Sequence, residues 1–199
     1  MEQIILTDET ALRADALRNR ERILAAAEAV FLEKGAGVSL DDVAKRAGVG
    51  IGTLYRRFPT REALLAAAFS GRFLNVAKSS HARDPHLGPV DAIRAYLEEL
   101  VRHTNVYRGL ATSLGTVLET GTPGCVACTE EGTRLLKRAQ IARVVRADIT
   151  FGDIVCIAVA ISLATEKERS QRTHIAHLVG VFIDGIGKLK SGDLSQPGS

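Results

Sequence analysis

The sequence has no tryptophan, only five prolines and only three cysteines among its 199 residues. Three cysteines are too few to cross-link a chain of this length, which excludes a disulfide framework and indicates a reducing compartment. The scarcity of proline, together with long stretches of Ala, Leu, Arg and Glu, favours a mostly helical chain. Strand-like alternation and internal repeats are also absent, so we predict an all-α fold.

Long hydrophobic runs are missing as well. The longest nearly uninterrupted run, residues 154–164, has eleven residues, well short of the roughly 20 that cross a bilayer as a helix. The first ten residues, "MEQIILTDET", are acidic, and their apolar run is too short for a signal peptide. We therefore expect no membrane partner and a cytoplasmic location.

Groups of residues that carry catalysis are also lacking. No Ser/His/Asp order and no pair of carboxylates at a suitable helical spacing stands out. His174 and His177 have the i, i+3 spacing of metal ligands, but no carboxylate follows on the next turn of that face. Packing or a subunit contact is the favoured role for both. We predict that the protein is not an enzyme and holds neither a metal nor a cofactor.

Charge is present, but unevenly distributed. Residues 13–61 contain ten Lys or Arg against six Asp or Glu, whereas from residue 81 onward the numbers are fourteen and thirteen. The net charge of +3 is too small to identify a nucleic-acid binder by itself. Its concentration in the first third is what a DNA-facing head on a neutral body requires, although a chance fluctuation would give similar numbers.

Residues 20–65 predict three helices and the start of a fourth. An apolar stripe at helical spacing runs through "NRERILAAAEAVFLEKG" and ends at Gly35. Ser39 caps a two-turn helix that Gly48 breaks. Pro59 ends the next helix, and a long amphipathic helix follows it.

Three alternating glycines, Gly48, Gly50 and Gly52, follow the second helix. A dinucleotide-binding turn would need a third glycine where Thr53 stands, and a strand rather than a capped helix before it. The helix-turn-helix interpretation fits instead, because Gly48 can take the positive φ of the turn while Leu54 buries the helix that follows. The residues left facing outward, toward a DNA groove, are Gly50, Thr53, Tyr55, Arg56 and Arg57.

The run "SLDDVAKRAGVGIGTLYRRFPTREALL" resembles the signature of the TetR-like (TetR/AcrR) family of bacterial one-component transcriptional repressors. The preceding "RERILAAAEAVFLEKG" is similar to that family's first helix, so the match covers residues 20–65. The resemblance implies a homodimer whose two heads bind a palindromic operator in double-stranded DNA, about one helical turn apart. It also implies that a small molecule bound in the body releases the DNA.

The resemblance assigns individual DNA contacts as well. Thr53 and Tyr55 match positions that usually contact DNA, Ser39 matches a backbone-phosphate contact, and Arg61 stands where the family usually has Lys. The family often has Lys where this chain has Ile51, which leaves the operator sequence open. With the outward basic face included, the predicted DNA-binding residues are Ser39, Gly50, Thr53, Tyr55, Arg56, Arg57 and Arg61.

The expected architecture is a three-helix helix-turn-helix head joined by a long helix to a helical body. We divide the chain into a flexible leader over residues 1–19, a DNA-binding domain over 20–65, a ligand-binding and dimerisation domain over 66–190, and a disordered tail over 191–199. Because the connecting helix is continuous, movement of the body would reach the head as through a rigid lever.

A ligand pocket is predicted among the middle helices, where a few polar groups stand among leucines. Such a lining suits a small, mainly apolar effector that makes a few hydrogen bonds. All of these residues would serve equally well as core. They are Tyr96, Leu100, His103, Tyr107, Leu110, Ser113, Leu114, Thr116 and Leu135.

The last two long helices carry more apolar surface than one copy of the chain covers. Ile154, Ala158 and Ile161 can face the body, which leaves apolar residues on the other side for a second copy. The predicted dimer interface contains Val155, Ala160, Leu163, His174, His177, Val181 and Gly185.

Two alternatives stay open. Cys125 and Cys128 form a lone C-x-x-C after a loop, which allows a thiol-based oxidant-sensing regulator on the same scaffold, although a structural pair is favoured. Cys156, inside an apolar helix, is predicted to lie in the core. The second alternative, a helical enzyme with a relic DNA-binding head, would need a catalytic group of residues that the sequence does not show.

Overall fold

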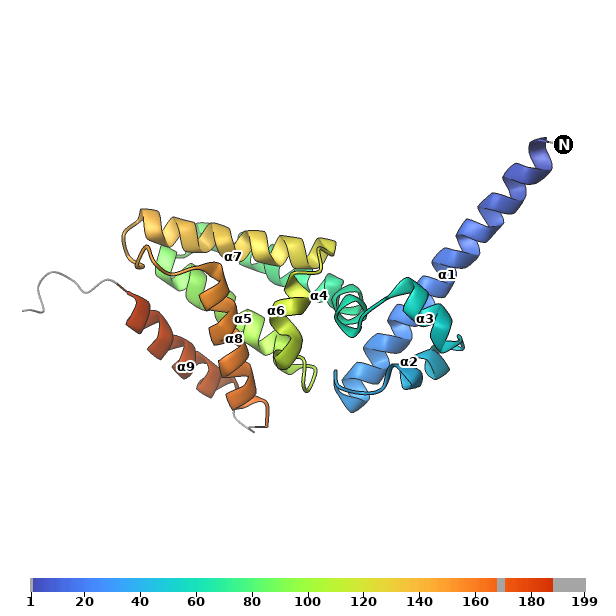
Figure 1. Cartoon of the computed structure of the whole chain (residues 1–199). Coiled ribbons are helices and arrows are strands. Elements are labelled where there is room, and N and C mark those ends of the chain that lie inside the picture. Colours follow the sequence, from blue (N-terminus) through green and yellow to red (C-terminus); the bar gives the residue numbers. More distant parts are fainter. Residues whose placement is uncertain (1, 168–170, 188–199) are drawn as a thin grey trace, which may run out of the picture.

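A computed structural model describes residues 2–167 and 171–187 of the chain (Figure 1). Within these ranges every regular element is a helix, apart from one isolated bridge between Val145 and Gly187, and the all-α prediction is confirmed. The head and the connection to the body consist of α1 (Glu2–Lys34), α2 (Leu40–Ala47), α3 (Ile51–Arg57) and α4 (Arg61–Arg83).

The first helix is longer than the sequence analysis predicts. α1 begins at Glu2, so a helix occupies residues 2–19, where a flexible leader is expected. Neither proline nor glycine interrupts the chain before Gly35, and nothing in the local sequence therefore ends a helix earlier. The first half of α1 extends away from the rest of the molecule (Figure 1). The predicted tail, residues 191–199, lies outside the described residues.

Over the described residues the body adds five helices to α4, and its core is continuous with that of the head. These are α5 (Pro89–Asn105), α6 (Leu114–Leu118), α7 (Pro123–Ile141), α8 (Phe151–Thr165) and α9 (Gln171–Ile186), with 3-10 turns at Asp84–His86 and Ala111–Ser113. In the part of the chain that the structure describes, no helix combines the length and the hydrophobicity needed to cross a membrane.

α4 and α7 pack side by side along the body (Figure 1). At Gly124, near the start of α7, an added Cβ would lie 1.8 Å from the carbonyl oxygen of Ser70 on α4. The Gly124 amide also donates a hydrogen bond to Ser70 Oγ at 2.9 Å. No side chain fits between the two backbones at this point, so the approach of α7 to α4 depends on glycine.

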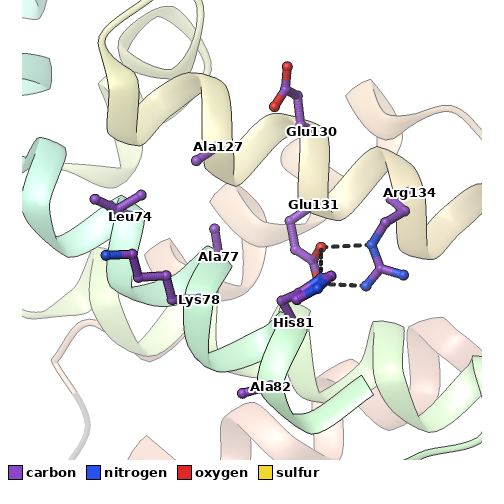
Figure 2. Close-up of a pocket in the computed structure, with 9 residues that line it drawn as sticks. All are labelled: Leu74, Ala77, Lys78, His81, Ala82, Ala127, Glu130, Glu131 and Arg134. Carbon is purple, nitrogen blue, oxygen red and sulfur yellow. Dashed lines mark hydrogen bonds and ion pairs between the residues drawn. The ribbon is translucent and has the colours of Figure 1, made fainter. Parts of the chain in front are cut away.

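A buried polar cluster joins α4 to α7 at the other end of this contact. Glu131 on α7 accepts hydrogen bonds from Ser80 at 2.9 Å and from Arg134 at 2.8 Å, and Arg134 also pairs with Asp84 at 2.8 Å. Arg138 forms a further ion pair with Asp84. Figure 2 shows Glu131 and Arg134 beside a groove of about 450 Å³ between the two helices.

Head and body also meet through the loop that follows α5. The Arg108 carbonyl in that loop accepts a hydrogen bond from the Ala36 amide in the α1–α2 turn at 2.8 Å. Gly35, with φ of 92°, lies so close that an added Cβ would come within 2.7 Å of the same oxygen. Both the positive φ and the short distance therefore favour glycine at this joint.

A second link between head and body centres on Glu28 of α1. Arg72 on α4 donates to its carboxylate through Nη2 at 2.9 Å and Nε at 3.3 Å, and the Tyr107 hydroxyl donates to the same oxygen at 3.2 Å. The Arg72 guanidinium lies over the Tyr107 ring, 5.1 Å from its centroid. Burial raises the pKa of Tyr107 to about 12, which keeps the hydroxyl protonated as a donor.

Candidate nucleic-acid interface

The turn between α2 and α3 has the geometry that the sequence predicts. Ser39 caps α2, and its Oγ accepts a hydrogen bond from the Asp41 amide at 3.2 Å. Gly48 ends α2 with a left-handed φ of 64°, a conformation that glycine adopts without steric cost. The Val49 amide then donates to the Ala44 carbonyl at 3.0 Å, which brings the chain sharply round into α3.

The inner face of α3 is anchored in the core of the head. Leu54 is fully buried, and Phe58, the residue after the helix, is 5% exposed. Arg20 on α1 places its guanidinium over the Phe58 ring, 5.9 Å from the centroid, a favourable contact between a cation and an aromatic face. This packing fixes which side of α3 is presented to solvent.

Two exposed ion pairs connect α1 with α2 and neutralise one cation on each helix. Lys34 pairs with Asp42 and Arg46 pairs with Glu33, each at 2.8 Å. The hydrogen bond from Lys34 holds the pKa of Asp42 below its ordinary value, so the carboxylate stays charged. Because Lys34 and Arg46 are neutralised by their partners, the positive charge that α2 and α3 leave without an ion pair among the described residues is that of Lys45 on α2 and of Arg56 and Arg57 on α3.

The outward face of α3 carries the predicted contact residues. Tyr55 is 48% exposed, Arg56 and Arg57 are exposed, and Thr53 is half-buried. Arg56 Nη2 donates to Thr53 Oγ1 at 3.0 Å, which orients the guanidinium along the helix. Among the described residues Arg57 makes no ion pair or hydrogen bond through its side chain. Its charge is available to a partner molecule.

The glycines at the start of α3 are not required by packing within the protein. A Cβ added at Gly50 or Gly52 would meet no atom within 4 Å. Glycine in a helix costs up to about 1 kcal/mol relative to alanine, so the molecule gains nothing internally from Gly52. The two residues instead leave the backbone of the first turn of α3 open to close approach from outside.

Arg61 differs from the other predicted contacts. Its Nη1 donates to the carbonyl oxygens of Ala36 at 2.8 Å and Val38 at 2.6 Å, and the side chain is partly buried. The guanidinium therefore ties the start of α4 to the turn between α1 and α2. The structure gathers Thr53, Tyr55, Arg56 and Arg57 on α3, with Gly50 directly before the helix, and places Ser39 at the N-terminus of α2.

Most of the predicted pocket residues belong to the packed core. Tyr96, Leu100, Tyr107, Leu110, Leu114 and Leu135 are at most 1% exposed. Ser113 is half-buried and Thr116 exposed. His103 lines a cavity at the body surface, whereas the other lining residues described for the surface cavities were not predicted. Polar residues among leucines at helical spacing are typical of core as well as of pockets, which explains the difference.

The three cysteines are free. Cys125 and Cys128 are buried, and the Tyr96 hydroxyl donates to the Cys128 carbonyl at 2.8 Å and lies 3.2 Å from its Sγ. Burial raises the pKa of Cys128 to about 12 and also raises that of Cys125. Reaction with oxidants needs the thiolate, so the oxidant-sensor alternative gains no support. Cys156 is exposed, and its predicted place in the core is wrong because it lies on the outer side of α8.

The predicted dimer residues lie on the outer side of α8 and α9. Ile154, Ala158 and Ile161 face the core, as expected. Leu163 is 49% and Val181 59% exposed, Ala160, His177 and Gly185 are exposed, and Val155 and His174 are half-buried. The rings of His174 and His177 have centroids 6.5 Å apart. Within the described residues, no three His, Cys, Asp or Glu side chains come together as metal ligands would.

A helix-turn-helix head joined by one continuous helix to a helical body defines the class of the molecule as a two-part helical regulator. Two family models match the chain. Residues 23–68 match the bacterial regulatory proteins of the tetR family, and residues 88–188 match the C-terminal domain of SbtR-like transcriptional regulators. The second match alone spans half of the sequence. The chain belongs to the TetR family of bacterial transcriptional regulators.

Individual relatives agree with this assignment. The TetR transcriptional regulator SCO0520 from Streptomyces coelicolor is 33% identical, over 84% of this chain and 98% of that one, with a TM-score of 0.52. RolR, solved in complex with resorcinol, is 21% identical over 85% and 89% of the two chains, with a TM-score of 0.62, and shows the fold alone. An HTH-type transcriptional regulator from Staphylococcus aureus is 43% identical over 54 residues, which span 29% of that relative.

Proposed function

We propose that the protein is a homodimeric transcriptional repressor that binds a palindromic operator through α3. The observation that carries the proposal is the outward face of this helix. Tyr55 and Arg57 project from it, and the backbone at Gly50 and Gly52 is bare. Arginine can bind guanine edges in a bidentate manner, and tyrosine hydroxyls commonly bind phosphate. A bare first turn lets the helix approach the floor of the major groove closely.

Dimerisation would bring two such heads to one operator. The exposed apolar residues of α8 and α9, such as Leu163 and Val181, support an interface on that side of the body. A two-fold axis through this face would place the heads on successive turns of one side of the duplex. The regulator would then recognise a palindromic sequence. We propose no catalytic role, since the family consists of transcriptional regulators.

Release of DNA would follow from binding of a small molecule in the body. α4 runs without interruption from the head to its contact with α7, so displacement of its body end would move the head. RolR, which shares the fold, was solved with resorcinol. The comparison supports a small-molecule effector for this chain, and the mainly apolar character of that effector stays a prediction.

The test measures binding of the purified protein to the DNA upstream of its own gene. Fluorescence anisotropy gives the affinity at each salt concentration of a series. We expect tight binding that weakens steeply as salt rises, because phosphate contacts release counterions. Arg57→Ala and Tyr55→Phe should each weaken binding by about tenfold, equivalent to about 1.4 kcal/mol. Arg143→Ala, which removes an exposed arginine from the body, is the charge-matched control for Arg57→Ala and should bind as the wild type does.

Two results would contradict the proposal. Wild-type protein that binds no duplex even at low salt would exclude DNA binding. Equal losses in Arg57→Ala and Arg143→Ala would show that the affinity depends on overall charge and not on α3. If the upstream DNA binds no better than random duplex, the operator has to be sought elsewhere in the genome by selection from a fragment library.

A further inference from the structure

A polar cavity of about 340 Å³ lies between α4, α5 and the start of α9. It lies apart from the α3 surface. His103 is the one lining residue that also belongs to the predicted apolar pocket. Among the lining residues that the structure describes, three are arginines, and only one has a carboxylate. The lining residues are Arg72, Glu99, Arg102, His103, Val106 and Arg172.

Within residues 2–167 and 171–187, the positive charge of this cavity is incompletely neutralised. The one carboxylate among the described lining residues, Glu99, is nearly buried and already pairs with Arg83 from outside the cavity. Arg102 has only a 3.5 Å contact with Glu98, one turn earlier on α5. Arg172 makes no ion pair among the residues that the structure describes. A partly enclosed space with surplus guanidinium donors favours an anion.

His103 lies in the wall of the cavity between two of its arginines. Its Nδ1 is buried and lacks a hydrogen-bond partner, while its Nε2 lies 3.8 Å from Glu99 Oε1. Burial lowers the pKa of His103, the charge of Glu99 opposes that effect, and Arg72 and Arg102 reinforce it. A carboxylate bound in the cavity would offset the two cations beside His103.

We propose that this cavity binds a small organic anion carrying carboxylate groups, and that the anion competes with Glu28 for Arg72. Arg102, Arg172 and His103 would bind the carboxylates. The inference replaces the mainly apolar effector predicted from the sequence with a small carboxylate. It rests on the proposed function for its regulatory meaning, although anion binding itself does not depend on DNA.

Competition for Arg72 would carry the signal to the head. Arg72 lines the cavity and at the same time donates two hydrogen bonds to Glu28 of α1. An anion that draws the guanidinium inward would weaken the link between α1 and α4 and leave Tyr107 as the remaining donor to Glu28. The position of the head relative to the body would then be less constrained.

The binding test uses isothermal titration calorimetry with succinate, its neutral diamide succinamide, and sulfate as an inorganic dianion. We expect succinate to bind, and the other two to bind at least tenfold more weakly. The variant Arg102→Gln/Arg172→Gln should lose at least tenfold in succinate affinity. Arg94→Gln/Arg143→Gln, which removes the same charge outside the cavity, should stay within twofold of wild type. Circular dichroism checks that each variant is folded.

Four other outcomes of this titration would contradict the proposed anion site. Absence of succinate binding, or succinamide binding as tightly as succinate, would exclude a carboxylate site. Sulfate binding equal to succinate would reduce the cavity to a patch of positive charge without selectivity for organic anions. Equal losses in the two double variants would place the binding outside the cavity.

The competition has its own test, again without DNA. If Glu28 and the anion compete for Arg72, then Glu28→Gln should bind succinate several-fold more tightly than the wild type, because the guanidinium is released. Unchanged affinity would exclude the coupling. The last measurement is release of the operator by succinate. We expect this release in the wild type and not in Arg102→Gln/Arg172→Gln. Failure of every duplex to bind would refute the proposed function alone, whereas operator binding that succinate leaves intact would refute the regulatory role of the site.

Discussion

Arg57 in the head is used in the opposite way to Arg134 and Arg138 in the body. On α3, Arg57 points to solvent and is free of carboxylates among the described residues. In the body, Arg134 and Arg138 turn toward Asp84, and Arg134 also pairs with Glu131. An unpaired guanidinium on a rigid helix is available to a partner, whereas one that meets a nearly buried carboxylate holds two helices together.

The same contrast holds for glycine. Gly124 in the body is required because α7 touches α4 there, while Gly50 and Gly52 in the head have open space around them. Residues that internal packing does not require are the ones whose role must be sought outside the molecule.

Arg61 is an exception among the arginines of the head. Its guanidinium binds backbone carbonyls within the protein and so has a structural role, as Arg134 and Arg138 have in the body.

The largest effect is expected at Gly124. Gly124→Ala places a Cβ 1.8 Å from the Ser70 oxygen, and relief of that overlap requires α7 to shift away from α4. We expect a loss of about 3 kcal/mol in the free energy of unfolding, measured by urea denaturation. Gly71→Ala on α4 is the control, because its Cβ would meet no atom within 4 Å. This variant should be as stable as the wild type or slightly more stable. Equal stability of the two variants would contradict the close contact.

A loss of about 2 kcal/mol is expected for Glu131→Gln at neutral pH. Burial alone would raise the pKa of Glu131, but the hydrogen bonds from Arg134 and Ser80 outweigh burial and lower it. A depressed pKa in the folded state means that the contribution is present above the unfolded pKa, about 4.3, and is lost as the pH falls through the folded value. Denaturation curves at pH 7 and at pH 3.5 should therefore show a deficit that shrinks at the lower pH.

Arg61→Ala is expected to reduce stability by about 1.5 kcal/mol, because two carbonyl oxygens lose a charged donor. Thermal denaturation measures this loss. If Arg61 serves only the fold, the slope of log affinity against log salt should match that of the wild type, whereas a phosphate contact would reduce the slope by about one. A reduced slope with unchanged stability would return Arg61 to the DNA-contact group.

The smallest effect on stability is expected at Gly52. Gly52→Ala should leave the protein as stable as the wild type or more stable by up to about 1 kcal/mol, since the new Cβ meets no atom. The same change should weaken operator binding, because the methyl group would stand between the helix and the DNA. Thermal denaturation and anisotropy on one protein sample check both parts. Unchanged operator affinity would refute a role for the bare backbone.

The details of the head could be predicted because they follow from local rules. The cap at Ser39, the turn at Gly48 and the burial of Leu54 each depend on residues within a few positions, and all three agree with the structure. The role of Arg61 could not be predicted in this way. Its acceptors, the carbonyls of Ala36 and Val38, lie more than twenty residues earlier and carry no sequence signal.

The body could be predicted as a set of helices but not as a set of cavities. Helical periodicity identifies the buried face of α8, yet it does not say how α4, α5 and α9 lie against one another. Arg72 and Arg172 meet in one cavity although a hundred positions separate them in the sequence. A search for polar residues among leucines therefore found Tyr96, which is core, and missed both arginines. A surplus of arginine around a half-buried histidine becomes visible only in three dimensions.

The accessibility of Cys156 offers a practical route to the assembly state. It is exposed on α8, next to Val155, whereas Cys125 and Cys128 are buried. Cys156 stands four residues before Ala160 and seven before Leu163, so it shares their face of α8, and a dimer joined through α8 and α9 would cover it. Maleimide reagents require a reachable thiolate. Labelling of Cys156 should therefore be fast in the monomer and slow in the dimer, and the labelling rate over a series of protein concentrations would report dimer formation.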